Sequence, residues 1–220
     1  MKNTQTPKSN GFTLIELLVV IAIISLLGTL MITTFISAKR DSEEFKVKAF
    51  IQTIGASLEV YQSDRRNGVY PPSSLEGFPA LGTKLPNKTN LGIEAMVVCL
   101  SSPNFGGLKD SETIESLLDN VDEDSSSRKM TKWGSNELFE LTDTWGNPLV
   151  YFNAQDYENR NVRAYSRTEP DVLDYEVVSV KPWMNPKTKS PYNSSTYQLF
   201  SAGPDGIFNT DDDIGNWSSK

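Results

Sequence analysis

Residues 11–16 read Gly11-Phe12-Thr13-Leu14-Ile15-Glu16, and an uncharged run of 22 residues follows from Leu17 to Ala38. As a helix rising ~1.5 Å per residue, this run would be roughly 33 Å long, close to the ~30 Å hydrocarbon core of a bilayer. An ordinary secretory signal has a shorter apolar core, which ends in small residues and is removed by cleavage on its far side. Nothing after Ala38 has that pattern, so the sequence predicts a helix that crosses a membrane.

The polar leader before this motif predicts the orientation of the helix. It carries two basic residues, Lys2 and Lys8. Cytoplasmic flanks of membrane helices carry an excess of Lys and Arg. We therefore expect the amino terminus in the cytoplasm and the bulk of the chain on the other side of the membrane.

Glu16 is an ionisable residue at the start of the apolar segment. A carboxylate inside a membrane helix costs on the order of 2.5 kcal/mol or more, so it is a functional hypothesis that needs a partner. Neither the lysines of the leader nor Lys39 is placed to serve. The alternative interpretation is a plain membrane anchor with a stray glutamate near the interface.

The motif from Gly11 to Leu17 resembles the processing site of type IV pilins and pseudopilins. The resemblance implies that a prepilin peptidase cuts after Gly11, which makes residues 1–11 a leader peptide, and that the new amino-terminal Phe12 is N-methylated. It also implies a role for Glu16 in filament assembly. The charged amine of Phe12, on this chain or on a neighbour, can neutralise Glu16 within the apolar packing of helices.

The helix is expected to continue past the membrane segment, as one helix from about residue 12 to residue 65. Residues 12–38 would form its transmembrane half and residues 39–66 its amphipathic half. In the second half, apolar residues recur at spacings of three and four, which predicts one face that packs on a sheet. Gly55 interrupts this pattern at a cost of about 1 kcal/mol relative to alanine. The predicted stripe contains Val47, Phe50, Ile51, Ile54, Leu58 and Tyr61.

Residues 67–220 are expected to form one globular domain outside the membrane, within which residues 82–141 look like an insertion relative to compact pseudopilins. In this insertion, Ile93–Leu100 is compatible with a strand or a short buried helix. Asp110-Ser111-Glu112 predicts a cap and an acidic first turn for a helix that runs through about Val121, and a charged loop is predicted from Asp122 to Lys129. Its acidic cluster could bind a cation, but a solvated loop is the favoured interpretation; the cluster contains Asp119, Asp122, Glu123 and Asp124.

The carboxyl-terminal part predicts a small antiparallel sheet of three or four strands. A turn at Asp143-Thr144-Trp145-Gly146-Asn147-Pro148 leads into a strand ending near Phe152, and two more strands are expected at Tyr175–Val180 and Thr196–Ser201. The turn resembles that of the major pseudopilin of type II secretion, and Trp145 and Tyr151 are interpreted as core anchors. The predicted fold class is α+β, a pilin fold.

Four aspartates lie within nine positions near the carboxyl end, from Asp205 to Asp213. Such a cluster favours calcium, which takes six to eight oxygen ligands in flexible geometry. Zinc is poorly supported, because the chain has no histidine and one cysteine, Cys99, which is interpreted as a buried small hydrophobe. The loop is similar to the calcium loop of the major pseudopilin, which implies Asp205, Asp212 and Asp213 as side-chain ligands. A merely solvated acidic tail is the alternative, and Trp217 is expected to hold the end against the sheet.

The net charge of −7, which would become −9 after loss of the leader, argues against a general nucleic-acid surface. The resemblance implies a structural subunit of a type II secretion pseudopilus, polymerised with other pseudopilin subunits on an inner-membrane assembly platform. It implies a bacterial inner-membrane protein with one span, a cytoplasmic amino terminus and a periplasmic domain. A type IV pilin or minor pilin for adhesion or DNA uptake is the alternative. Nothing in the sequence calls for an enzyme, since histidine and phosphate-binding glycine loops are missing.

Overall fold

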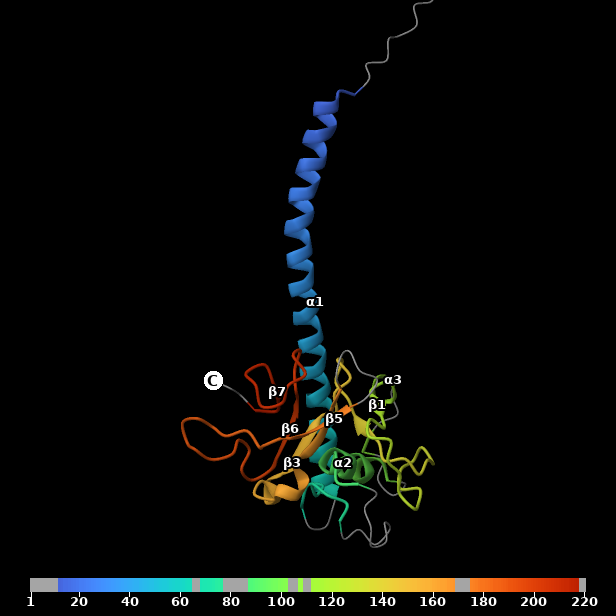
Figure 1. Cartoon of the computed structure of the whole chain (residues 1–220). Coiled ribbons are helices and arrows are strands. Elements are labelled where there is room, and N and C mark those ends of the chain that lie inside the picture. The colour runs from blue at the N-terminus through green and yellow to red at the C-terminus, as the bar shows by residue number, and fades with distance from the viewer. Residues whose placement is uncertain are drawn as a thin grey trace, which may run out of the picture. The chain divides into compact units, whose positions relative to one another are not determined.

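A computed structural model describes residues 12–64, 68–76, 87–102, 107–108, 112–168 and 175–217 (Figure 1). Gly11, with the predicted leader of residues 1–11, lies outside the described residues. The chain separates into two compact units, Met1–Ser42 and Glu43–Lys220. Helix α1, Leu14–Asp64, contributes to both units, which confirms the prediction of one long helix.

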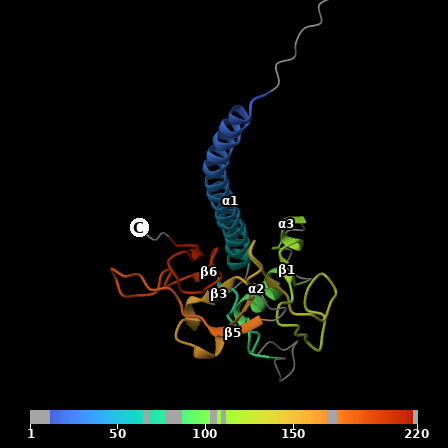
Figure 2. The same cartoon turned by 45° about the horizontal axis from the view of Figure 1, so that its top comes forward.

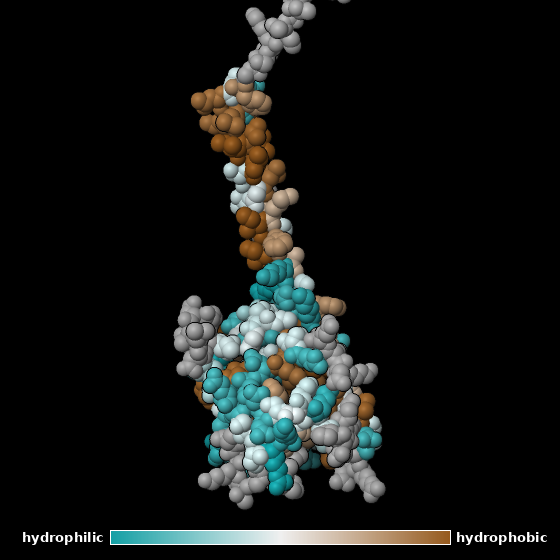
Figure 3. All heavy atoms as spheres, turned by 90° about the vertical axis from the view of Figure 1, so that its right-hand side faces the viewer, coloured by the Kyte–Doolittle hydropathy of each residue, from teal (hydrophilic) through white to brown (hydrophobic). Residues whose placement is uncertain are grey.

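The part of α1 in the first unit is apolar and exposed. Most of the large hydrophobic side chains that are exposed among the described residues lie between Leu14 and Ile36. In Figure 3 they form two brown stretches of this helix, with a paler band between them. By length and composition, α1 is the one helix among the described residues that could cross a membrane.

The part of α1 in the second unit carries the predicted apolar stripe. All six stripe residues are buried, and they join the main hydrophobic core of the unit. Gly55 interrupts the stripe where the helix passes strand β6, Tyr197–Ser201. A Cβ atom at Gly55 would lie 3.2 Å from the hydroxyl oxygen of Tyr197, so glycine allows the helix to approach this closely. The interruption of the pattern therefore has a packing reason.

Helix α2, Leu91–Ser101, resolves the alternative that the sequence left open for this segment. It is a helix, and every one of its residues is buried, including Cys99. A helix that is apolar all round belongs inside a core, which explains why periodicity alone did not identify it. One residue of this helix, Glu94, is acidic and is nevertheless fully buried.

Among the described residues the strands form three small antiparallel sheets, where the sequence predicted one sheet of three or four strands. Figures 1 and 2 show the ribbon from two directions. The two strand predictions that end near Phe152 and Ser201 are correct, and these strands pair directly, with Val150 opposite Phe200. The third prediction is β5, but it pairs with β4, a strand that the sequence did not indicate, in a separate sheet. The first sheet contains β3 (Val150–Asn153), β6 and β7 (Ile214–Gly215). The second pairs β4 (Ala164–Thr168) with β5 (Tyr175–Ser179). The third pairs β1 (Leu118–Asp119) with β2 (Glu140–Leu141).

The helix predicted to begin at Asp110-Ser111-Glu112 and run through about Val121 is wrong for most of its length. Helix α3 covers only Glu112–Glu115, and the chain then turns into β1. Leu118 lies opposite Leu141 in the sheet, so pairing with β2 replaces the helical hydrogen bonds. Two short 3₁₀ helices, Ala154–Asp156 and Arg160–Val162, follow β3.

The core of the second unit is rich in aromatic residues. Tyr151, Phe152, Tyr165 and Phe200 are fully buried, which confirms Tyr151 as a core anchor. Trp145 packs only partly buried against the same core. Trp217 packs against the sheet as predicted, stacked on Tyr192 and edge-on to Phe200; the ring centroids are 5.6 Å and 5.4 Å away.

Candidate functional sites

The amino-terminal motif forms the first turn of α1. Phe12 precedes the helix with 80% of its surface exposed, and the carboxylate of Glu16 lies over the start of the helix. Glu16 Oε2 accepts hydrogen bonds from the backbone N–H of Thr13 at 2.8 Å and from its hydroxyl at 2.7 Å. In return, the Thr13 hydroxyl oxygen accepts a hydrogen bond from the backbone N–H of Glu16 at 3.3 Å.

This reciprocal arrangement is a capping box, which satisfies N–H groups that would otherwise lack partners at a helix start. The sequence signature, Thr-x-x-Glu before an apolar run, is present at residues 13–16. The sequence interpretation considered only charged partners for Glu16 and missed Thr13. Glu16 therefore has two candidate tasks, to cap its own helix and to meet an amino terminus.

The carboxyl-terminal acidic loop brings two of its three predicted ligands together. The Thr210 hydroxyl lies within hydrogen-bond distance of Asp205 Oδ2, at 3.2 Å, and of Asp212 Oδ1. The backbone N–H of Asp205 also donates to Asp212 Oδ2 at 3.2 Å. Burial opposes ionisation of Asp212, but its hydrogen bonds with Thr210 and Asp205 together lower its pKa. Asp211 is exposed.

Asp213, the third predicted ligand, is directed elsewhere. Its Oδ2 accepts a hydrogen bond from the indole N–H of Trp183 at 2.7 Å and another from the backbone N–H of Asn209 at 2.9 Å. Burial raises the pKa of Asp213 to about 6, although these hydrogen bonds oppose the shift. In this structure Asp213 therefore ties the loop to Trp183, while Asp205 and Asp212 face each other.

Gly203 allows the acidic loop to close. It has a φ of +72°, and a Cβ atom there would lie 2.3 Å from the backbone carbonyl oxygen of Asp212. Only glycine accepts both the left-handed conformation and this close approach. The loop therefore gathers a carbonyl oxygen and two carboxylates, the ligand types that calcium takes.

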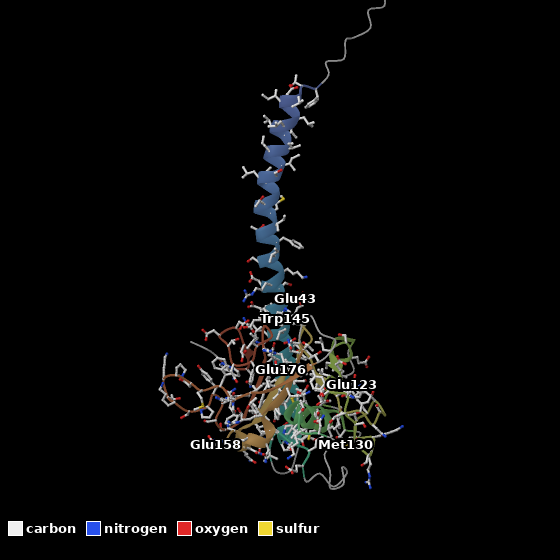
Figure 4. The ribbon with its side chains drawn as sticks, in the orientation of Figure 1. Glu43, Glu123, Met130, Trp145, Glu158 and Glu176 are labelled. Atoms are coloured by element: carbon white, nitrogen blue, oxygen red, sulfur yellow. The ribbon has the colours of Figure 1, made fainter. Side chains whose placement is uncertain are left out.

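A second acidic cluster is buried in the segment predicted as an insertion. Glu94, Asp122 and Glu140 each place one carboxylate oxygen so that the three atoms lie within 4.8 Å of one another, a spacing that could hold a metal ion. Asp124 is buried beside them. The predicted solvated loop is thus wrong for Asp122 and Asp124, which are 6% and 8% exposed. It is correct for Asp119 and Glu123, and Figure 4 labels Glu123.

The electrostatics of this cluster follow from its burial. Removal from water raises the pKa of Glu94 well above its usual value, and the nearby Asp124, Glu140 and Asp122 add to the effect. Burial, followed by repulsion from Asp122, likewise raises the pKa of Glu140. The sequence held one signal for this site, because Glu94 is a lone acidic residue inside an apolar run.

Comparisons with known proteins agree with the amino-terminal motif. The family described as "Prokaryotic N-terminal methylation motif" matches residues 6–32. "Type II secretion system core protein G" of Escherichia coli is 24% identical over 212 residues, covering 96% of this chain and 93% of that protein. The protein of the same name from Pseudomonas aeruginosa is 24% identical over 215 residues, covering 98% and 99%. That from Vibrio cholerae is 32% identical over 80 residues, covering 36% and 53%.

By these matches the chain carries a prokaryotic N-terminal methylation motif and is similar to pseudopilins of type II secretion. The similarity to core protein G, the major pseudopilin of type II secretion, extends over nearly the whole chain. The alternative of a surface pilin is not favoured by these relatives. No solved structure matched the chain.

Proposed function

We propose that this protein is a structural subunit of a type II secretion pseudopilus, which polymerises through α1 to drive protein export. The observation that carries the proposal is the apolar start of α1. Its side chains are exposed around the whole helix, and such a surface needs lipid or neighbouring helices to cover it. The prepilin motif before it and the similarity to core protein G support the same assignment.

Processing and location follow from the motif in this proposal. A prepilin peptidase cleaves after Gly11, and the amine of Phe12 is then methylated. The protein spans the bacterial inner membrane once, with a cytoplasmic amino terminus and a periplasmic globular domain, and an inner-membrane assembly platform receives it. The lysines of the leader support this orientation.

Assembly in this proposal depends on the negative charge of Glu16. As each subunit joins, the Phe12 amine of one chain meets Glu16 of another within apolar packing, which sets the register between helices. The capping box uses Oε2 of Glu16 for both Thr13 donors, so the same carboxylate can serve its own helix and a neighbour.

The acidic loop has a structural role in this proposal, as a calcium site formed by Asp205, Asp212 and Asp213 with backbone carbonyl oxygens of the loop. The contacts between Asp205, Thr210 and Asp212 support it, as does the close approach of the Asp212 carbonyl to Gly203. A calcium ion that binds only the folded loop would stabilise the domain by mass action. Asp213 would have to share its carboxylate with Trp183.

Two substitutions of Glu16 test the assembly step. Glu16→Ala removes both the charge and the cap, whereas Glu16→Gln removes the charge but keeps an oxygen that can accept from Thr13. In cells that overproduce the secretion system, we expect both variants to insert in the membrane and neither to appear in sheared, sedimented filaments. Membrane fractionation and immunoblotting of the pellet measure both properties.

The glutamine variant separates the two tasks of Glu16. If Glu16→Gln enters filaments as well as the wild type does, the charge is not needed and the register argument is wrong. Ser25→Ala is the matched control, because the Ser25 hydroxyl donates only to the Ile21 carbonyl of its own helix. It should leave insertion and incorporation unchanged.

A further inference from the structure

We propose that Glu94, Asp122 and Glu140 form a second calcium site, separate from the carboxyl-terminal loop, which holds the inserted segment together. The three side chains come from α2, from the turn after β1 and from β2. Their nearest oxygen atoms lie within 4.8 Å of one another. Two oxygens bound to one calcium ion at about 2.4 Å can be at most about 4.8 Å apart, so the spacing fits a common ion.

Glu94 supplies the independent observation that points to a ligand. Its exposed fraction is 0%, and neither of its carboxylate oxygens has a hydrogen-bond partner among the residues that the structure describes. A buried carboxylate without a partner is costly, and native structures rarely leave one in place. Within the same described part of the chain, Asp122 Oδ1 has no hydrogen-bond partner, and neither has either carboxylate oxygen of Asp124. These free oxygens belong to one buried cluster.

The remaining oxygens of the cluster are held by neutral donors. The side-chain amide of Asn90 donates to Glu140 Oε1 at 2.9 Å, and the backbone N–H of Val121 donates to Glu140 Oε2 at 3.0 Å. The side-chain amide of Asn87 donates to Asp122 Oδ2 at 3.0 Å. Asn90 is itself fixed, because its carbonyl oxygen accepts from the backbone N–H of Ser166 at 2.9 Å.

Charge balance favours a cation at this place. The three carboxylates carry three negative charges when ionised, and in the described part of the chain none of their hydrogen-bond or ion-pair partners is Lys or Arg. Buried charges are normally paired or bound to a metal. One divalent ion would reduce the charge of the three to −1 and would take the free oxygens of Glu94 and Asp122 as ligands.

The ligand chemistry selects calcium among the common divalent ions. All candidate ligands are oxygen atoms, whereas zinc prefers nitrogen and sulfur ligands, so zinc is disfavoured. Magnesium usually keeps several of its waters, whereas calcium accepts bidentate carboxylates and irregular geometry. Glu94 and Glu140 are both fully buried, so the site suits an ion that gives up its water.

The site gives the insertion a structural centre of its own. All three ligands lie between residues 82 and 141, and together they connect α2 with β2 and with the turn that follows β1. In the ribbon of Figure 1, β1 and β7 lie on opposite sides of the globular unit. The two acidic sites can therefore bind calcium independently.

Calcium stoichiometry of the full-length protein in detergent tests the site. We compare the wild type with a triad variant, Glu94→Gln/Asp122→Asn, and a loop variant, Asp205→Asn/Asp212→Asn. After chelation and equilibrium dialysis against calcium, we expect two bound ions per wild-type chain and one in each variant. Glu123→Gln is the matched control, an exposed carboxylate in the same turn, and should still bind two.

The outcomes separate this proposal from the calcium loop. The triad site is supported if the loop variant binds one ion and the triad variant binds one ion fewer than the wild type. This holds even if the wild type binds only one ion, in which case the calcium loop proposal fails and the triad proposal stands. If the triad variant binds as much calcium as the wild type, the proposal is overturned. Should the triad variant not fold, the loop variant decides, because it keeps the triad: one bound ion supports the site and none overturns it.

A competition measurement tests the choice of ion. In the loop variant, calcium should remain bound in the presence of a tenfold excess of magnesium, and its addition should raise the melting temperature of the chelated protein. Loss of the bound calcium to magnesium would overturn the assignment of a calcium site.

Discussion

At the scale of single residues, Asp143 shows how one side chain can set a turn. Its Oδ1 accepts hydrogen bonds from the backbone N–H groups of Trp145 at 2.9 Å and Asn147 at 3.0 Å. Its Oδ2 accepts from the Ser201 hydroxyl at 2.6 Å, which ties the turn to β6. Gly146, with a φ of +86°, completes the reversal into β3. The motif Asp-x-Trp-Gly is therefore explained by the turn that it forms.

The pH dependence of stability should reveal the buried state of Asp143. Burial raises its pKa above the ordinary value, against the opposing effect of its hydrogen bonds from Ser201 and the turn. Because the folded pKa exceeds the unfolded one, Asp143 contributes stability that is present below the unfolded pKa, about 3.9, and is lost as pH rises through the folded pKa. We expect the melting temperature of the wild type minus that of Asp143→Asn to fall over this rise in pH.

Circular dichroism melting curves at a series of pH values measure this difference. The other carboxylates titrate in both proteins and cancel in the subtraction. A difference that stays constant, or that grows with pH, would show that burial does not govern Asp143.

Residue types could be read from the sequence at these sites, but their burial could not. Glu16 was recognised because it interrupts an apolar run, and Glu94 interrupts one in the same way. The sequence interpretation used this signal to single out Glu16 but did not apply it to Glu94. Asp122 gave no such signal, since its neighbours are polar and only the packing of its turn beside α2 removes it from water.

At the scale of elements, helix α1 was predictable because two sequence signals, a continuous apolar run and then a helical spacing of apolar residues, follow each other along it. The apolar run gives its first part, and the spacing of three and four gives the stripe that the structure buries. The sheets were less predictable, because strand pairing depends on contacts between distant residues. Nothing local to Tyr175–Ser179 indicates that it pairs with Ala164–Thr168 and not with β6. The prediction of a helix after α3 was wrong for the same reason, because β1 pairs with the distant strand β2.

Substitutions on the two faces of α1 should differ strongly in their effect on stability. Leu58 is fully buried in the core, so Leu58→Ala should lower the free energy of unfolding by about 2–5 kcal/mol through lost burial and the cavity left behind. Val60, two residues later, is 55% exposed, and Val60→Ala should change it by no more than about 0.5 kcal/mol. Chemical denaturation followed by tryptophan fluorescence measures both. Equal losses would contradict the assignment of the buried face.

At the scale of the whole molecule, the two compact units differ in whether their apolar side chains are buried. The unit of residues 43–220 buries its own apolar residues in a closed core. In the unit of residues 1–42, the large apolar side chains that the structure describes are exposed, so it needs lipid or other copies of α1 to cover them. In a membrane-inserted subunit that later enters a filament, lipid covers these side chains first and other copies of α1 cover them afterwards. We propose that its entry depends on a new amino terminus at Phe12 beside Glu16.

Mass spectrometry of the protein purified from membranes tests this central claim most directly. The intact mass and the amino-terminal peptide report cleavage and methylation together. We predict a chain that begins at Phe12 and carries one methyl group on its amine. A chain that keeps residues 1–11 would contradict the account.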